Sequence, residues 1–189
     1  RYFDTYILDL NTNIEKCVTE FNEPSPISAV GWSADEKYIL YQKFYSNSNH
    51  DLLIYDTRSA VITNMTEHTG NMKNTGGMFN KKADTIYFVS DYEREFLALA
   101  YYKIKTGEIG WFQSENWDIT NYLFSHDEKH LLYSVNESGT TKLKMKNLKS
   151  GKTKNLKIPK GNCNSIEFTK DDKKIVLIFD SPQNPNDIY

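Results

Sequence analysis

Short apolar runs separated by charged turns recur along this chain of 189 residues. Four segments align without gaps, and each contains an aromatic residue, a small polar residue, a charged turn and then a run rich in β-forming residues. They begin at Trp32 (WSADEKYILY), Phe79 (FNKKADTIYF), Phe124 (FSHDEKHLLY) and Phe168 (FTKDDKKIVL). These aromatic anchors are 47, 45 and 44 residues apart. A fixed period of this length indicates a repeat protein.

A second element recurs in phase with the first, and in it a strand ends at a tight polar turn. Its copies start at Leu8 (LDLNTN), Tyr55 (YDTRSA), Tyr102 (YKIKTG) and Lys146 (KNLKSG), at steps of 47, 47 and 44 residues. Two of the copies end at a glycine, a residue for which a positive φ costs little. Because the two elements recur in phase, with steps that differ by at most two residues, the repeat is a true structural unit.

Each repeat resolves into four strands, and the second of these is an almost continuous apolar run, as in Tyr38–Tyr41 or Lys174–Phe179. Such runs suit strands that are covered on both faces. The sequence therefore predicts an all-β fold, a β-propeller fragment of four-stranded antiparallel blades with about three complete blades and two half-blades. The predicted division is a half-blade at 1–22, blades at 27–67, 75–115 and 118–158, and an incomplete blade at 163–189, whose third strand starts at Asp187.

Composition supports this assignment and limits the partners. The aromatic content of 14% and the 13 Tyr and 10 Phe favour pleated, half-buried surfaces. A formal net charge of −2 produces no overall field toward nucleic acid or anionic membranes, so we expect neither as a partner. Eight lysines between Lys142 and Lys160 leave two interpretations open, a nucleic-acid patch or a solvated outer edge, and we favour the edge.

Residues for catalysis or metal binding are not evident. The chain lacks the Gly-x-Ser-x-Gly elbow of α/β-hydrolases. Cys17 and Cys163 stand apart from any Cys/His cluster, and the four histidines show no metal-ligand spacing. Acidic pairs such as Asp171-Asp172 lie in turns and are interpreted as exposed turn formers. We therefore expect no catalytic residue, no metal and no cofactor in this chain.

Longer and more varied loops are predicted on one face of the blades, where connections between second and third strands meet those between blades. Function usually lies on variable loops of a rigid scaffold. The loop Tyr92–Glu95 belongs to this face, and Glu93, Arg94 and Glu95 are its candidate substrate-facing residues. We expect Arg94 either to contact a peptide or to pair locally with Glu93 or Glu95.

From about Ser90 onward the chain resembles the propeller of the prolyl oligopeptidase family of serine peptidases, particularly the acylaminoacyl-peptidase-like members. The resemblance rests on three stretches: SDYEREFLALAYYKIKTGEI from Ser90, WDITNYLFSHDEKHLLYSVNESG from Trp117, and the C-terminal segment from Lys157. The preceding half matches generic blades, which are similar also to TolB-like propellers.

This resemblance implies a propeller that gates and filters peptide substrates for a C-terminal α/β-hydrolase domain, which this chain lacks. No triad residue can be transferred to it. The alternative is a TolB-like propeller that acts as a protein-interaction scaffold. The expected partners are the hydrolase domain and a peptide, and the expected location is the cytoplasm. Because open blade faces need a cover, we also expect dimerisation, domain exchange or pairing of the terminal half-blades, with a closed four-bladed ring as the outlying arrangement.

Overall fold

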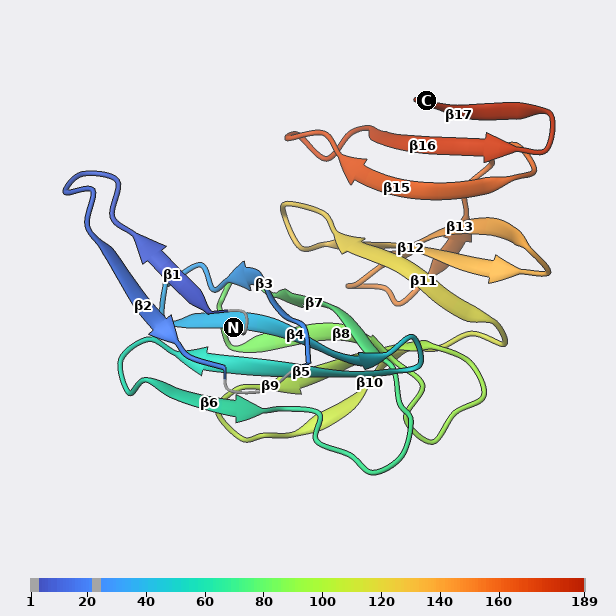
Figure 1. Cartoon of the computed structure of the whole chain (residues 1–189). Helices are drawn as coiled ribbons and strands as arrows, with labels where there is room; N and C mark the ends of the chain where they lie inside the picture. Colours follow the sequence, from blue (N-terminus) through green and yellow to red (C-terminus); the bar gives the residue numbers. More distant parts are fainter. Residues whose placement is uncertain (1–3, 22–24, 189) are drawn as a thin grey trace. The chain divides into compact units, whose positions relative to one another are not determined.

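The computed structural model describes residues 4–21 and 25–188, which form seventeen β-strands and no helix. The strands make five antiparallel sheets, and neighbours in sequence are hydrogen-bonded neighbours within each sheet (Figure 1). Sheet 1 consists of β1 (Thr5–Leu8) and β2 (Glu15–Thr19). Sheet 2 consists of β3 (Ile27–Trp32), β4 (Tyr38–Ser46), β5 (Asn49–Asp56) and β6 (Val61–Asn64).

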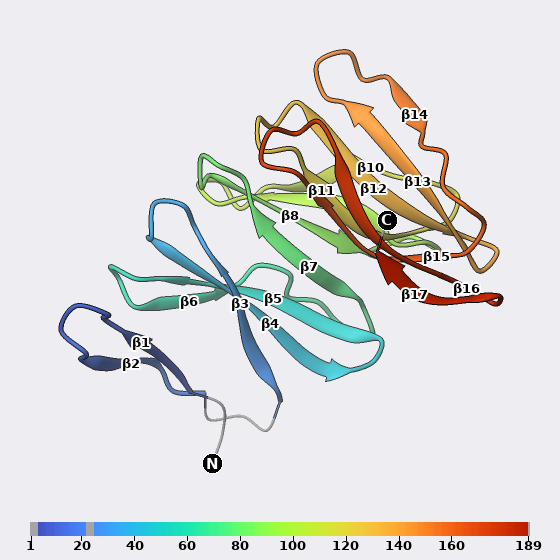
Figure 2. The same ribbon diagram turned by 90° about the horizontal axis from the view of Figure 1, so that it is seen from above.

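The remaining sheets have the same up-and-down order. Sheet 3 consists of β7 (Asn74–Phe79), β8 (Thr85–Ser90), β9 (Ala98–Lys103) and β10 (Ile109–Gln113). Sheet 4 consists of β11 (Asp118–Phe124), β12 (His130–Glu137), β13 (Thr140–Asn147) and the short β14 (Thr153–Asn155), which forms its outer edge (Figure 2). Sheet 5 consists of β15 (Asn162–Phe168), β16 (Ile175–Ser181) and β17 (Asn184–Ile188).

These sheets confirm the predicted fold class, propeller blades of four antiparallel strands flanked by smaller sheets. The four anchor aromatics occupy equivalent positions, since each is the last residue of the first strand of its sheet. The third strand of sheet 5 starts earlier than expected, at Asn184 instead of Asp187. The chain groups into two compact units, one of residues 1–95 and 99–113, the other of residues 96–98 and 114–189.

Alternation along β4 explains why second strands are apolar at every position. Ile39 and Tyr41 pack into a cluster with residues of sheet 1 and its connection, including Val18 and Phe21. Leu40 points to the opposite face. There it joins a cluster with Leu52, Ile54 and Met65 of its own blade and Ile86, Phe88 and Ala100 of sheet 3. The strand therefore contributes to two cores at once.

In β16 one face is covered within the second unit and the other is exposed, as expected for an open blade face. Leu177 and Phe179 are buried in a cluster with Leu132 and Leu143 of sheet 4. The alternate residues Val176 and Ile178 remain 40% and 38% exposed. An apolar run predicts a strand that can be covered on both faces, but burial also needs a second neighbouring sheet, and among the described residues of the second unit only sheet 4 packs against sheet 5.

Three of the four charged turns between first and second strands share one hydrogen-bond pattern. Ser33 Oγ donates to Asp35 Oδ1 at 2.8 Å and accepts from the backbone N–H of Tyr38 at 2.9 Å. Ser125 and Thr169 make the same two contacts in their own turns. The fourth residue of each turn has a positive φ, at Glu36, Ala83, Glu128 and Asp172. The repeated sequence therefore encodes a repeated local structure.

Candidate functional site

The loop Tyr92–Glu95 connects β8 to β9 and is held at its base by backbone contacts. Asp91 Oδ1 accepts a hydrogen bond from the Lys73 backbone N–H at 2.8 Å, and the Asp91 carbonyl accepts one from the Arg94 N–H at 3.0 Å. Glu93 has φ = 51°, in the left-handed region. The side chains of Glu93, Arg94 and Glu95 are all exposed. The loop is therefore a fixed turn that presents three charged side chains to solvent.

Arg94 stacks on an aromatic ring of the next outer strand. Its guanidinium carbon lies 4.9 Å from the centroid of the Trp111 ring on β10. Trp111 itself is 40% exposed. Over residues 4–21 and 25–188, no ion pair joins Arg94 to either glutamate within the distance of a salt bridge. Glu93 instead raises the pKa of the Tyr92 hydroxyl through a hydrogen bond and its negative charge. A cation–π contact of this kind limits the rotamers of the guanidinium and leaves its N–H donors available.

A pocket of about 380 Å³ lies beside this loop. Its walls come from the connection between β6 and β7 and from β8, β9 and β10. The apolar lining consists of Met72, Phe88, Tyr92, Ala100, Ile109 and Trp111, and the polar lining of Thr66, Glu67, His68, Asn74 and Ser90. Tyr92 and Trp111 therefore belong to both the loop contact and the pocket.

Most polar side chains of the pocket are already hydrogen-bonded to the protein. Ser90 Oγ donates to Asn74 Oδ1 at 2.8 Å and accepts from the Tyr92 N–H at 3.1 Å. The Asn74 amide donates to the His50 carbonyl at 3.2 Å. Thr66 Oγ1 donates to Asp51 Oδ1 at 3.2 Å. A ligand therefore gains little from these groups, because their hydrogen bonds are satisfied.

His68 forms part of one wall and is fixed by a buried acid. Its Nδ1 lies 2.9 Å from Asp51 Oδ1 and 2.8 Å from the Thr66 carbonyl oxygen, and its Nε2 lies 2.9 Å from Asn49 Oδ1. The side chains of His68 and Asp51 are 6% and 5% exposed. Asp51 also accepts hydrogen bonds from Tyr45 and Asn64. This network makes the wall rigid; the sequence pattern did not reveal it, because its members are scattered over residues 45–68.

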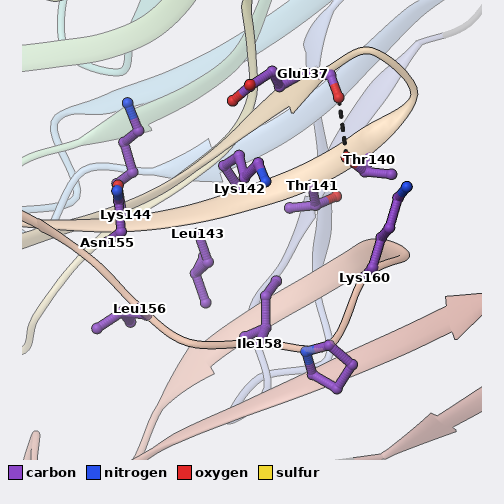
Figure 3. Close-up of a pocket in the computed structure, with 11 residues that line it drawn as sticks. Glu137, Thr140, Thr141, Lys142, Leu143, Lys144, Asn155, Leu156, Ile158 and Lys160 are labelled. Carbon is purple, nitrogen blue, oxygen red and sulfur yellow. Dashed lines mark hydrogen bonds between the residues drawn. The ribbon is translucent and has the colours of Figure 1, made fainter.

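A second pocket, of about 400 Å³, lies at the outer edge of sheet 4 (Figure 3). Leu143 and Ile158 point toward each other across it, while Lys142 and Lys160 contribute ammonium groups (Figure 3). Lys144 is neutralised by Glu115 at 2.7 Å. This is the lysine-rich edge predicted from the sequence, and its lysines differ in surroundings, since Lys144 is half-buried and Lys142 is exposed.

Within residues 4–21 and 25–188, no three or more His, Cys, Asp or Glu side chains are grouped so that they can hold a metal ion. In the same part of the chain, no helix has the length and apolarity needed to cross a bilayer.

Asp171 and Asp172 lie in the turn between β15 and β16, where Asp171 accepts a hydrogen bond from Thr169 Oγ1 at 2.7 Å.

The blades of four antiparallel strands define a β-propeller domain. Comparison with known proteins shows which family it belongs to. The family model of the dipeptidyl peptidase IV N-terminal region matches residues 4–186. The chain belongs to this family. None of the curated proteins matches the chain.

Solved structures with this fold include TolB proteins and peptidases. TolB from Acinetobacter baumannii has a TM-score of 0.71 at 16% identity, over 98% of this chain and 45% of that one. A structure from a study of two prolyl endopeptidases has a TM-score of 0.76 at 15% identity, over 93% and 26%. A puromycin-hydrolyzing peptidase of Mycobacterium tuberculosis has a TM-score of 0.74 at 8% identity, over 92% and 28%. This chain thus spans less than half the length of each.

Proposed function

We propose that this propeller domain gates and filters peptide substrates for an α/β-hydrolase serine peptidase domain, and that the loop Tyr92–Glu95 faces the substrate. The observation that carries the proposal is the family match, which extends over residues 4–186. Two of the structures with the same fold are those of a prolyl endopeptidase and a puromycin-hydrolyzing peptidase. Each is more than three times as long as the part that this chain matches, which leaves room for a second domain.

Arg94 is the residue of this loop that we assign to peptide contact. A guanidinium has several fixed donors that bind carbonyl or carboxylate oxygens. Stacking on Trp111, which lines the pocket, restrains the guanidinium, so that less side-chain entropy is lost when a peptide binds. Glu93 and Glu95 flank it and disfavour approach of a strongly anionic substrate.

The test is kinetic and uses the protein in which the hydrolase domain accompanies the propeller. Arg94→Ala should lower kcat/KM for a peptide about 10-fold, a loss of about 1.4 kcal/mol of transition-state stabilisation. It should leave the hydrolysis of a small ester and the melting temperature unchanged. Arg58→Ala is the matched control, because Arg58 is an exposed arginine on the turn between β5 and β6. No loss with Arg94→Ala, or equal loss on ester and peptide, contradicts the assignment.

A second candidate function is a protein-interaction scaffold of the TolB type. It is favoured by the similarity to TolB, which extends over 98% of this chain. The two functions require different coding sequences downstream of the propeller in the gene. A Gly-x-Ser-x-Gly motif within a few hundred codons downstream of Tyr189 supports the peptidase, and an open reading frame without it supports the scaffold.

A further inference from the structure

The pocket beside the Tyr92–Glu95 loop offers a ligand apolar surface more than hydrogen bonds. The rings of Phe88, Tyr92 and Trp111 and the side chains of Met72 and Ile109 line it. Three of its polar side chains, on Thr66, Asn74 and Ser90, bond to other protein groups. Its volume of about 380 Å³ is at the lower end of the range for small-ligand pockets, about 300–1,000 Å³. Space of this size suits one large side chain and not a folded segment.

Charged side chains of both signs contact or belong to the lining of this pocket. Glu67 is exposed and lines it, and Arg94 stacks on Trp111 of the same lining. An isolated cation or anion would meet repulsion from one of the two groups. A neutral peptide backbone carries both a donor and an acceptor. It therefore complements a carboxylate and a guanidinium together.

We propose that this pocket is a specificity subsite for a bulky apolar side chain of an extended peptide, of the Phe or Leu class, with the adjoining peptide groups held by Arg94 and Glu67. The subsite gives the filter a preference for sequence in addition to size. Its role in substrate selection rests on the proposed function, but the binding itself does not.

Rigidity of the walls supports selection by shape. The Asp51–His68 pair and the Ser90–Asn74 contact fix two sides of the pocket, and Phe88 and Ala100 are 1% exposed members of the core. A preformed pocket binds without the cost of ordering its own residues. Burial of an aromatic side chain instead of serine then favours binding by about 1.5–3 kcal/mol, which is about 10–100-fold.

The experiment measures binding of two blocked, uncharged tripeptides to this chain by calorimetry: acetyl-Gly-Phe-Gly-amide and acetyl-Gly-Ser-Gly-amide. The Phe peptide should bind at least about 10-fold more tightly. Trp111→Ala and Ile109→Lys should abolish this preference. The matched controls are Trp117→Ala, an equally exposed tryptophan outside the pocket, and Ile62→Lys, an outer-strand isoleucine also outside it; their exposed fractions are 39% and 37%. Neither control should change the preference.

Equal affinity for the two peptides, or loss of the preference in either control as well, overturns the proposal. Ile109 is 48% exposed, so Ile109→Lys preserves the core and keeps the test valid even where Trp111→Ala lowers the melting temperature. Failure here is distinguishable from failure of the gating function. If the chain prefers the Phe peptide but Arg94→Ala leaves peptide hydrolysis unchanged, the subsite is supported and the assigned role of Arg94 in gating is not. If the chain shows no preference but Arg94→Ala slows peptide hydrolysis, only the gating role is supported.

Discussion

Asp172, in the turn between β15 and β16, joins sheet 5 to the turn of sheet 4 at His126. Its Oδ1 accepts a hydrogen bond from the His126 backbone N–H and lies 2.8 Å from His126 Nδ1, and its Oδ2 accepts one from the Asp127 N–H at 2.9 Å. The residue with a positive φ in one repeat thus binds the backbone of the preceding repeat. Interpreted from sequence as a simple turn former, Asp172 also connects two blades.

This contact makes the stability of the second unit sensitive to acid. Burial raises the pKa of Asp172, but hydrogen bonds from His126 and Asp127 outweigh this effect, and the net pKa lies below the ordinary 3.8. The stabilisation is therefore present above pH 3.8 and is lost as the pH falls below that value. Asp172→Ala should lower the denaturation midpoint at pH 7 and reduce its loss on acidification. Asp187→Ala, at an exposed carboxylate of the same unit, is the control, and identical pH profiles for both variants would contradict the prediction.

Leu132 and Asp127 separate core packing from turn formation in the same blade. Leu132 is 0% exposed and packs in the cluster of sheets 4 and 5, so Leu132→Ala should cost about 2–5 kcal/mol of unfolding free energy. Asp127 accepts hydrogen bonds from Ser125 Oγ at 2.7 Å and the Lys129 N–H at 3.0 Å, on an exposed turn. Asp127→Ala should cause a smaller but measurable loss. A greater loss for Asp127→Ala in urea denaturation would show that the packing assignment is wrong.

Two Tyr–Glu–Lys trios differ in burial and provide a matched pair. Tyr133 Oη and Lys144 Nζ both donate to Glu115 at 2.7 Å, and Tyr133 is 0% exposed. Glu115→Ala leaves the buried hydroxyl without this acceptor and should cost about 1–3 kcal/mol. In the exposed trio, Tyr101 and Lys103 donate to Glu108 at 2.8 Å. Glu108→Ala should therefore have little effect on the denaturation midpoint, and equal losses would refute the role of burial.

The buried trio also sets an alkaline limit. Burial first, and then the hydrogen bond and charge of Glu115, raise the pKa of Tyr133 above the ordinary 10.0. Its stabilisation is complete below pH 10.0 and is lost as the pH rises toward the folded pKa, because the unfolded chain ionises first. Tyr133→Phe should lessen the loss of stability between about pH 9 and pH 11, measured by circular dichroism. An unchanged profile would assign the alkaline transition to other groups.

Exposed apolar residues on sheet 5 predict association. Val176 and Ile178 on β16 and Ile188 on β17 are 40%, 38% and 70% exposed. Burial of this face through dimerisation, domain exchange or pairing with sheet 1 removes apolar surface from water. We expect Val176→Cys to react slowly with a thiol reagent at high protein concentration. A monodisperse monomer by light scattering, with labelling as fast as in the unfolded chain, would contradict all three arrangements.

The sequence predicted the blades because their information is local. The turn residues Ser125, Asp127 and Lys129 bond mainly to one another and to the next strand. Because these contacts join residues close in the sequence, the spacing of the residues predicts the turn. Burial on both faces of a strand depends on a second neighbouring sheet, so the apolar run of β16 does not by itself determine whether Val176 is buried. The early start of β17 was missed since Asn184 and Pro185 are residues that rarely open a strand.

The candidate site was predictable only in part. The position of Arg94 on an exposed loop can be inferred from strand order, but its contact with Trp111 joins residues 17 positions apart and depends on the register in which β10 pairs with β9. No periodicity marks the Asp51–His68 pair either, because β5 and the connection after β6 are brought together by the hydrogen bonds of Asp51 to Thr66 and Asn64. A search for aromatic residues on exposed outer strands would have found Trp111.

The shared hydrogen-bond pattern of the charged turns has a consequence for how such chains grow. Ser33 closes its turn through Asp35 and Tyr38, within six residues, so the register of each inner hairpin is fixed without help from distant segments. A duplicated stretch of about one period therefore contains the residues that determine the local fold of the added unit. Low sequence separation also speeds formation of each hairpin. Duplication of such a stretch within the gene can thus change the number of blades while the turn contacts within each blade are kept.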